Sequence, residues 1–285
     1  MGSSSILGGA IQDLTAKEYG LIRDLVYQHC GINLGDNKMQ LVRARLGKRL
    51  RTLKMTSYRE YYEHVKADRS GGEMTVLIDS ISTNTTHLFR ENQHFQFLED
   101  AVRTWASKPK RAAREPMRIW SAGCSSGEEP CTIVMTMDNL TRQITGLNYL
   151  LLATDISTRM LERAAAGVFP QDRLANVPPD FKKRYFKRIK QGGEIAWQFD
   201  PQVYKQIRFA QLNFMDGQFP FRHGFDVIFC RNVMIYFDRA TQEDLVAKFA
   251  KALNPGGHLM IGHSESLNNI KHPLTYVKPT IYRKP

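Results

Sequence analysis

Several polar segments of this sequence follow short apolar runs, and the first of them could bind a ligand with a positively charged end. It reads Ser121-Ala-Gly-Cys-Ser-Ser-Gly-Glu-Glu-Pro130, and its two glycines allow backbone amides to approach a ligand closely. The segment lacks the GxGxxG pattern, and its adjacent acids, Glu128 and Glu129, would repel a pyrophosphate. An acidic loop after a glycine turn suits instead a cationic group, such as the ammonium and sulfonium of S-adenosylmethionine.

Three further segments could complete such a site. Asp155 ends an apolar run and could accept hydrogen bonds from a ribose diol. Leu212-Asn213-Phe214 offers an amide and an apolar surface for adenine, and Arg231-Asn232-Val-Met-Ile-Tyr236 follows another apolar run. Each feature has a plainer interpretation: glycines that make turns, an aspartate that caps the next helix, an arginine in a surface ion pair, and a tyrosine packed in the core. The residues alone leave both interpretations open.

The order of apolar runs predicts the elements that would position these side chains. Strands are expected over 118–123, 149–155, 225–230 and 257–262, separated by helices over 129–140, 157–166 and 240–253. This alternation is typical of a parallel sheet covered on both faces, in which ligands bind beyond the carboxyl ends of the strands. Residues 170–208 break the pattern, with a basic helix expected over 181–190 and a small hairpin around Gly192-Gly193.

Residues 15 to about 106 indicate helices only. Capping boxes at Thr15-Ala-Lys-Glu18 and Ser57-Tyr-Arg-Glu60 predict two helix starts, and Gly31 predicts a helix end. Helices are therefore expected over 15–30, from about 36 to 53, and over 57–65, 72–82 and 91–105. The second of these carries seven basic residues between positions 38 and 54 and no acid.

Composition excludes several classes of protein. The 285 residues, of which 42% are hydrophobic, allow one large or two modest domains and exclude disordered and fibrous chains. No uncharged apolar run reaches the length of a membrane span, and the first residues, expected to form a disordered tail over 1–12, do not resemble a signal peptide.

Cysteine spacing and charge indicate the environment. The four cysteines form no CxxC pair and have no histidine at metal-ligand spacing, which disfavours a zinc site and fits a reducing cytoplasm. The net charge of +12 predicts an acidic partner, which could be nucleic acid, an anionic protein face or an anionic lipid surface.

Five blocks of the sequence, in this order, resemble the chemotaxis receptor methyltransferases, the CheR family. They are Thr83-Asn-Thr-Thr-His-Leu-Phe-Arg-Glu91, Trp120-Ser-Ala-Gly-Cys-Ser-Ser-Gly-Glu-Glu-Pro130, Ala153-Thr-Asp155, Phe229-Cys-Arg-Asn-Val-Met-Ile-Tyr-Phe237 and Gly262-His-Ser-Glu265. The resemblance extends from about Thr15 to Tyr282. It implies S-adenosylmethionine-dependent protein-glutamate O-methylation on the cytoplasmic helices of chemoreceptors, with S-adenosylhomocysteine as the second product, for sensory adaptation.

The resemblance also implies an α/β architecture in two parts. An N-terminal all-helical receptor-docking domain (13–83) is followed by a linker and helix (84–115). A Rossmann-like class I S-adenosylmethionine-dependent methyltransferase domain (116–285) then contains a small inserted antiparallel β-subdomain at about 171–209. The insertion has one Gly-Gly pair only, which favours an enzyme that binds no receptor tether and leaves the question open.

The resemblance assigns roles to individual positions. The residues expected to contact the cofactor are Asn84, Thr86, Arg90, Gly123, Glu129, Asp155, Asn213, Phe214, Arg231 and Asn232. Arg90 and Tyr236 are expected nearest the transferred methyl group, and no metal is expected. Phe214 stands where leucine is usual in the family, a position expected to supply mainly backbone and apolar contact.

The basic helix gains a function from the same resemblance. Glutamate-rich receptor helices could dock on its cationic side chains, although a merely solvated helix face is the alternative. The residues expected to dock the substrate are Arg43, Arg45, Lys48, Arg49, Arg51 and Lys54.

Two other functions remain as rivals. A nucleic-acid methyltransferase would share the fold and suit the positive charge, but no Asn/Asp-Pro-Pro-Tyr/Phe motif stands at 231–236. A non-catalytic sensor could bind the cofactor as a signal, but the set Arg90, Asp155, Arg231 and Tyr236 favours an enzyme. We therefore expect a cytoplasmic monomer that binds chemoreceptors, binds no nucleic acid and inserts into no membrane.

Overall fold

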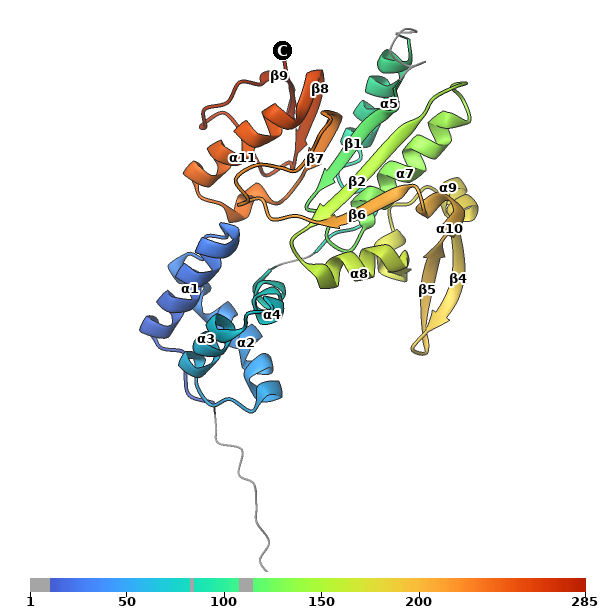
Figure 1. Cartoon of the computed structure of the whole chain (residues 1–285). Coiled ribbons are helices and arrows are strands. Elements are labelled where there is room, and N and C mark those ends of the chain that lie inside the picture. Colours follow the sequence, from blue (N-terminus) through green and yellow to red (C-terminus); the bar gives the residue numbers. More distant parts are fainter. Residues whose placement is uncertain (1–10, 83–84, 108–114) are drawn as a thin grey trace, which may run out of the picture. The chain divides into compact units, whose positions relative to one another are not determined.

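The computed structural model describes residues 11–82, 85–107 and 115–285, and the chain forms two compact units, Met1–Thr83 and Asn84–Pro285 (Figure 1). Residues 1–10 of the expected tail lie outside the described residues. Among the described helices, none combines the length and the apolar composition that crossing a membrane requires.

The first unit is helical, as the sequence predicts. Its elements are α1 (Ala16–Cys30), the 3-10 helix η1 (Asp36–Lys38), α2 (Met39–Leu53), α3 (Tyr58–Ala67) and α4 (Gly72–Ile81). A complete capping box begins α1, because Thr15 Oγ1 accepts from the Glu18 N–H and the Glu18 carboxylate accepts from the Thr15 N–H over 2.9 Å. Gly31 ends α1 with a φ of 72°, where a residue without Cβ is favoured.

The second predicted capping box is only half formed. Ser57 Oγ accepts from the Glu60 N–H over 3.1 Å, but the Glu60 carboxylate accepts from the N–H of Thr56 instead of that of Ser57. The carbonyl of Thr56 in turn accepts from the N–H of Gln12 over 2.8 Å. The folded unit therefore includes Gln12, which was expected in the disordered tail.

The second unit is built on a seven-stranded sheet. Its strands are β1 (Met117–Ala122), β2 (Tyr149–Asp155), β6 (Ile207–Gln211), β7 (Phe225–Cys230), β8 (Leu253–Ile261), β9 (Thr275–Lys278) and β10 (Ile281–Arg283). Their order is β6-β2-β1-β7-β8-β10-β9, and the first five are parallel. The four predicted strands are parallel, as expected, whereas β10, which the sequence did not predict, is antiparallel to both β8 and β9.

Helices cover both faces of this sheet. The helices are α5 (Gln93–Ala106), α7 (Glu128–Thr141), α8 (Thr158–Ala166) and α11 (Arg239–Ala252). The chain runs outward from β1 to β2 and β6, and later in the opposite direction from β7 to β8. Right-handed crossovers therefore place α7 and α8 on one face and α11 on the other, and α5 packs against α7.

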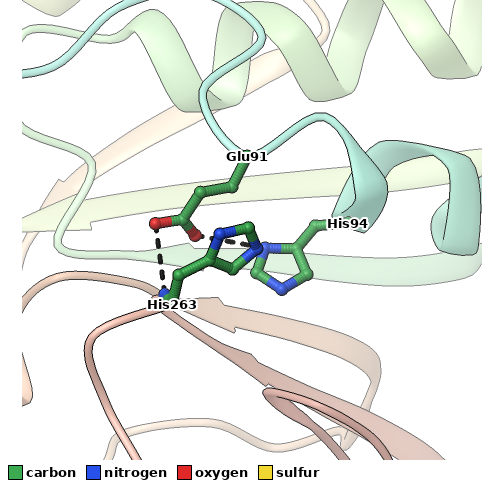
Figure 2. A group of neighbouring side chains, drawn as sticks. All are labelled: Glu91, His94 and His263. Carbon is green, nitrogen blue, oxygen red and sulfur yellow. Dashed lines mark hydrogen bonds and ion pairs between the residues drawn. The ribbon is translucent and has the colours of Figure 1, made fainter.

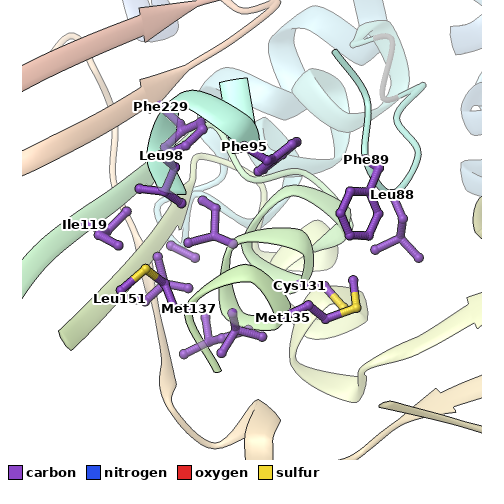
Figure 3. Packing of buried hydrophobic residues seen from close by; sticks show 14 of the residues in the cluster. Leu88, Phe89, Phe95, Leu98, Ile119, Cys131, Met135, Met137, Leu151 and Phe229 are labelled. Carbon is purple, nitrogen blue, oxygen red and sulfur yellow. The ribbon is translucent and has the colours of Figure 1, made fainter. Parts of the chain in front are cut away.

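Alternate side chains of β1 pack on opposite faces of the large sheet. Ile119 packs with Leu98 of α5, Met137 of α7 and Leu151 of β2 (Figure 3). The next residue, Trp120, contacts an aromatic cluster on the opposite face that includes Phe249 of α11, with ring centroids 5.2 Å apart. The chain runs outward from β1 in one direction and from β7 in the other, and packing on both faces of the sheet holds this central pair of strands in place.

A small antiparallel sheet is inserted between β2 and β6. The insertion contains β3 (Val168–Pro170), the 3-10 helix η2 (Gln171–Leu174), α9 (Pro179–Tyr185), β4 (Phe186–Gln191), β5 (Glu194–Phe199) and α10 (Pro201–Tyr204), with the strand order β3-β5-β4. The predicted hairpin is present, but the predicted helix over 181–190 is wrong beyond Tyr185. Gly192 and Gly193, both with positive φ, turn the chain back, and Phe186 packs on Phe199 with ring centroids 5.1 Å apart. Strand pairing therefore overrides the helical preference of the basic segment.

Candidate functional site

The polar segments singled out from the sequence meet at one edge of the large sheet. Asp155 is the last residue of β2, Asn213 follows β6, and Arg231 follows β7. The loop 123–127 follows β1, and Glu265 lies just beyond β8. Since these five strands are parallel, their carboxyl ends lie at the same edge, where open α/β sheets bind ligands.

The loop after β1 is held by the carboxylate of Asp155. Its Oδ2 accepts from the Ser125 N–H over 2.8 Å, and its Oδ1 accepts from the Ser157 N–H over 3.0 Å. Ser157, whose Oγ accepts from the Met160 N–H, is the cap of α8. The simpler interpretation of Asp155 as the helix cap is therefore wrong. A carboxylate oxygen has two lone pairs, so Asp155 can hold this loop and also accept from a diol.

Glycine is required in this loop by backbone geometry. Gly123 has a φ of 85°, and a Cβ on it would lie 2.6 Å from Cγ2 of Val233. Gly127 has a φ of 96°, and its Cβ would lie 3.0 Å from Ala164. Ser125 between them has a buried hydroxyl without a hydrogen-bond partner among the described residues. The loop thus brings backbone and an unsatisfied hydroxyl to the sheet edge, which fits a polar cofactor.

A buried ion cluster joins three segments of this edge. Arg231 donates from Nη1 to Glu129 Oε2 over 2.9 Å and from Nη2 to Glu91 Oε2 over 3.1 Å. The side chain of Arg231 is 3% exposed, so the alternative of a surface ion pair is wrong. Burial raises the pKa of the Glu129 carboxyl. The positive charge of Arg231 and a hydrogen bond from Ser121 Oγ act in the opposite direction and lower this pKa. Arg231 therefore links the end of β7 to the first turn of α7 and to the segment that carries Arg90.

Arg90 lies in a tight turn that these contacts hold in place. Its neighbours Phe89 and Glu91 have φ angles of 57° and 55°, which are uncommon for residues with side chains. Arg231 donates to the Arg90 carbonyl, and the Phe89 N–H donates to Thr132 Oγ1 of α7 over 3.1 Å. The half-buried Arg90 side chain donates to the carbonyl of Thr85 over 3.0 Å.

Glu91, His94 and His263 offer three potential metal-ligand atoms within 4.8 Å of one another (Figure 2). Both oxygens of the Glu91 carboxylate already accept hydrogen bonds, Oε2 from Arg231 and Oε1 from the His263 N–H over 3.1 Å. A divalent cation here would also lie beside the permanently charged Arg231 guanidinium. The cluster therefore fits a hydrogen-bonded anchor better than a metal site.

His94 is neutral in this cluster. Its Nε2 lies 2.7 Å from Thr280 Oγ1, whose hydroxyl donates to the Pro279 carbonyl. On the other side of the ring, His94 Nδ1 lies 3.5 Å from Glu91 Oε2. Burial first, and then the positive charge of Arg231, lower the pKa of His94 to about 3.

Glu265 shapes the segment after β7. Its carboxylate accepts from the backbone N–H groups of Asn232 over 2.9 Å, Gly262 over 2.5 Å and Ile235 over 3.3 Å. Tyr236, at the end of the 3-10 helix η3 (Met234–Tyr236), is half-buried. Asn232 and Tyr236 are thus presented by a segment that one carboxylate anchors.

The segment after β6 is fixed from α11. Lys248 donates to the carbonyls of Phe214 and Asp216, and Asn213 Oδ1 accepts from the Met215 N–H over 3.0 Å. The Phe214 ring packs 5.7 Å from that of Phe249. The structure therefore places the backbone of Asn213 and Phe214 at the carboxyl end of β6, and the Phe214 ring packs in the aromatic cluster around Trp120 and Phe249.

Other predicted residues are placed differently. Asn84 lies outside the described residues, and the carbonyl of Thr86 accepts a hydrogen bond from Arg173. Sequence reasoning gave no role to Glu91, Glu265 or Arg173. Glu91 and Glu265 stand inside the quoted motifs, so those motifs carried the only available signal.

The basic helix α2 lies in the first unit, and its charges are not equivalent. Arg49 pairs with the buried carboxylate of Glu73 over 2.5 Å, and Arg45 donates to the carbonyls of Ile81 and Ser82. Arg43 pairs with Asp13. Besides Arg43, the exposed basic side chains among those expected to dock the substrate are those of Lys48, Arg51 and Lys54.

The parallel strand order, the acidic glycine loop after β1 and the carboxylate at the end of β2 define a class I S-adenosylmethionine-dependent methyltransferase. Residues 84–283 match the family described as "CheR methyltransferase, SAM binding domain", and residues 17–82 match "CheR methyltransferase, all-alpha domain". The chain belongs to the CheR methyltransferase family, as its motifs suggested.

Individual relatives match over nearly their full length. The chain is 38% identical to the "Chemotaxis protein methyltransferase" of Borreliella burgdorferi, over 95% of each chain. It is 38% identical to the "Probable chemotaxis protein methyltransferase" of Rhizobium etli, over 91% of this chain and 96% of that one. With the "Chemotaxis protein methyltransferase" of Escherichia coli it shares 35% identity, over 94% and 91% of the two chains.

Proposed function

We propose that this protein methylates glutamate side chains in the cytoplasmic region of bacterial chemoreceptors, using S-adenosylmethionine, and that it thereby serves sensory adaptation. The observation that carries the proposal is the meeting of Asp155, the segment 231–236 and the Arg90 turn at one sheet edge of a CheR-family chain. The names of its relatives support a role in chemotaxis. On this proposal the protein acts as a monomer in the cytoplasm.

The reaction needs few protein groups. A glutamate carboxylate has a pKa of about 4.3 and is ionised at pH 7, so no general base is needed. One carboxylate oxygen bonds to the methyl carbon while the carbon–sulfur bond breaks, and the electron pair stays on sulfur. The products are a methyl ester and the neutral thioether S-adenosylhomocysteine, and no proton moves. The protein therefore contributes mainly positioning and exclusion of water.

Cofactor binding is assigned to the residues at the strand ends. Asp155 would accept from the ribose hydroxyls, and the backbone after β6, at Asn213 and Phe214, would border the adenine. Glu129 and the amides around Gly123 would face the charged amino-acid end. These assignments rest on the polar groups at this edge, on the unsatisfied Ser125 hydroxyl and on the family motifs.

Arg90 and Tyr236 would act on the substrate carboxylate. The Arg90 guanidinium would orient it, and the Tyr236 hydroxyl would donate to one of its oxygens. Too strong an ion pair with Arg90 would stabilise the ground state and slow the reaction, so part of the charge of Arg90 should act on the cofactor. Arg231 would contribute indirectly, because its donors hold Glu91, Glu129 and the Arg90 carbonyl.

Receptor docking is assigned to the exposed part of α2. Lys48, Arg51 and Lys54 would approach the acidic receptor helices, whereas Arg45 and Arg49 stabilise the first unit itself. Rim charges of this kind increase the rate of encounter more than they increase the final affinity.

A nucleic-acid methyltransferase is the rival function that the net charge of +12 favours. Transfer of labelled methyl from S-adenosylmethionine to a chemoreceptor cytoplasmic fragment, to DNA and to RNA separates the two. We expect label on the receptor that alkali releases as methanol. Label on nucleic acid would support the rival, and tight cofactor binding without any transfer would indicate a sensor.

A further inference from the structure

Glu265 is a buried carboxylate whose surroundings are backbone amides. The residue is 8% exposed, and no lysine or arginine of the described residues forms an ion pair with it. Its Oε2 accepts from the N–H groups of Asn232 and Gly262, and its Oε1 accepts from that of Ile235. A buried carboxylate is stable only where hydrogen bonds compensate for its lost solvation. The three N–H groups supply these hydrogen bonds, so the position of the carboxylate and that of the backbone around it depend on each other.

Two of these amides belong to the segment that carries Asn232 and Tyr236, the residues assigned to cofactor binding and catalysis. Ile235 precedes Tyr236, and Asn232 itself has a φ of 59°, a left-handed conformation that needs support from its surroundings. The space around Asn232 is also tight, because a Cβ on Gly262 would lie 2.5 Å from Asn232 Nδ2.

The same strand end anchors the Arg90 turn. The N–H of Gly262 donates to Glu265, and the next N–H, that of His263, donates to Glu91 beside Arg90. Two adjacent peptide groups after β8 therefore connect the two segments that carry Arg90 and Tyr236.

We propose that Glu265 is a positioning residue of the methyl-transfer site, whose carboxylate fixes the backbone of residues 232–235 and so orients Tyr236 and Asn232. The expected effect of Glu265 on turnover rests on the proposed function. The expected effect of Glu265 on the environment of Tyr236 does not rest on it.

The test compares Glu265→Gln, Glu265→Asp and the control Glu162→Gln, which changes an exposed glutamate of α8. Glutamine keeps the size of the side chain, but its NH₂ group must face at least one of the three N–H donors. Aspartate keeps the carboxylate on a shorter side chain. Each full-length protein is labelled with 3-fluorotyrosine, the ¹⁹F resonance of Tyr236 is assigned by its loss in Tyr236→Phe, and kcat and KM are measured on a receptor fragment.

We expect the Tyr236 resonance to shift or broaden in Glu265→Gln, while the resonances of Tyr58 and Tyr61 in the first unit stay unchanged. We expect kcat to fall about tenfold or more with a smaller change in the KM for S-adenosylmethionine, because a small displacement of a reacting group has a large effect on rate. Glu265→Asp should recover part of the rate, and Glu162→Gln should match the wild type.

A folded Glu265→Gln protein with an unmoved Tyr236 resonance and normal kcat would overturn the proposal. Loss of the cooperative fold in both Glu265 variants would also overturn it, because the carboxylate would then support the core instead of the segment. A wild-type protein that methylates no receptor would contradict the proposed function alone, since the ¹⁹F comparison still decides the role of Glu265.

Discussion

Arg231 Nη2 donates to Glu91 Oε2 over 3.1 Å, although 140 residues separate the two in the chain. The pair is buried, with side chains 3% and 11% exposed. It connects the end of β7 to the turn that carries Arg90, and a second carboxylate, Glu129, completes the cluster over 2.9 Å. The geometry of the candidate site therefore depends on a largely buried network of one arginine and two carboxylates.

Replacing Arg231 tests this network. Arg231→Met would leave Glu91 and Glu129 buried without their cation, so we expect the free energy of unfolding to fall by about 3–5 kcal/mol in urea titrations. The control Arg239→Met breaks an exposed pair with Glu243 and should change it by about 0.5 kcal/mol or less. Equal losses in the two variants would show that the buried network has no special importance.

The burial of neutral His94 predicts a specific dependence of stability on pH. Its pKa is about 3 in the folded protein and about 6.5 in an unfolded chain, so the unfolded state binds more protons between these values. Stability from this group is present above pH 6.5 and is lost as the pH falls, by about 1.4 kcal/mol at pH 5.5.

Chemical unfolding at pH 7.5 and 5.5 measures this effect. The free energy of unfolding should fall between pH 7.5 and pH 5.5, and in His94→Gln this fall should be smaller by about 1.4 kcal/mol. In the control His223→Gln, which changes an exposed histidine, the fall should equal that of the wild type. An unchanged difference in His94→Gln would mean that His94 is not held neutral in the fold.

Gly123 allows a matched test of the loop 123–127, which we propose binds the cofactor. Gly123→Ala would place a Cβ 2.6 Å from Val233 in a residue with a φ of 85°, so we expect affinity for S-adenosylhomocysteine to fall about tenfold or more by calorimetry. Gly146 has a similar φ of 78° but open space around it. Gly146→Ala should therefore keep wild-type affinity, and similar affinities in the two variants would exclude a close approach of the ligand at Gly123.

Charge reversal on α2 tests docking. The triple variant K48E/R51E/K54E should raise the KM for a receptor fragment about tenfold at low salt, with unchanged affinity for S-adenosylhomocysteine and a weaker dependence on ionic strength. Arg49→Glu should instead destabilise the first unit, because it would place a second acid beside the buried Glu73. Normal KM in the triple variant would remove α2 from the docking surface.

Arg90 and Tyr236 should separate catalysis from cofactor binding. We expect Tyr236→Phe to lower kcat about tenfold while affinity for S-adenosylhomocysteine stays within about twofold of wild type, because only one hydrogen bond to the substrate is lost. Arg90→Ala should lower kcat and weaken substrate binding together. Full turnover in Arg90→Ala would contradict its assignment.

Local signals predicted most of the helices and four of the seven strands of the large sheet, β1, β2, β7 and β8, whereas β6 was not predicted. The Thr15–Glu18 capping box and Gly31 define α1 because their hydrogen bonds lie within a few residues of each other. Strand β4 was mistaken for helix because its structure depends on pairing with β5, which a local pattern does not reveal. The antiparallel strands β9 and β10 were missed because they are short and depend on β8.

The candidate site shows the same limit. Asp155 could be placed from its position at the end of a strand, but the partners of Arg231 lie 102 and 140 residues away. The basic side chains of α2 looked equivalent in the sequence, and only the position of Glu73 distinguishes Arg49 from Lys48. Contacts between distant segments therefore decided which charged residues support the fold and which remain on the surface.

The most direct test of the proposed function is to map the modified residue. A chemoreceptor cytoplasmic fragment treated with this protein and S-adenosylmethionine would be digested and sequenced by tandem mass spectrometry, before and after mild alkali. We expect the added methyl on glutamate side chains, lost in alkali and about tenfold less abundant with Tyr236→Phe at short reaction times. A modification on any other residue type, or one that resists alkali, would contradict glutamyl ester formation.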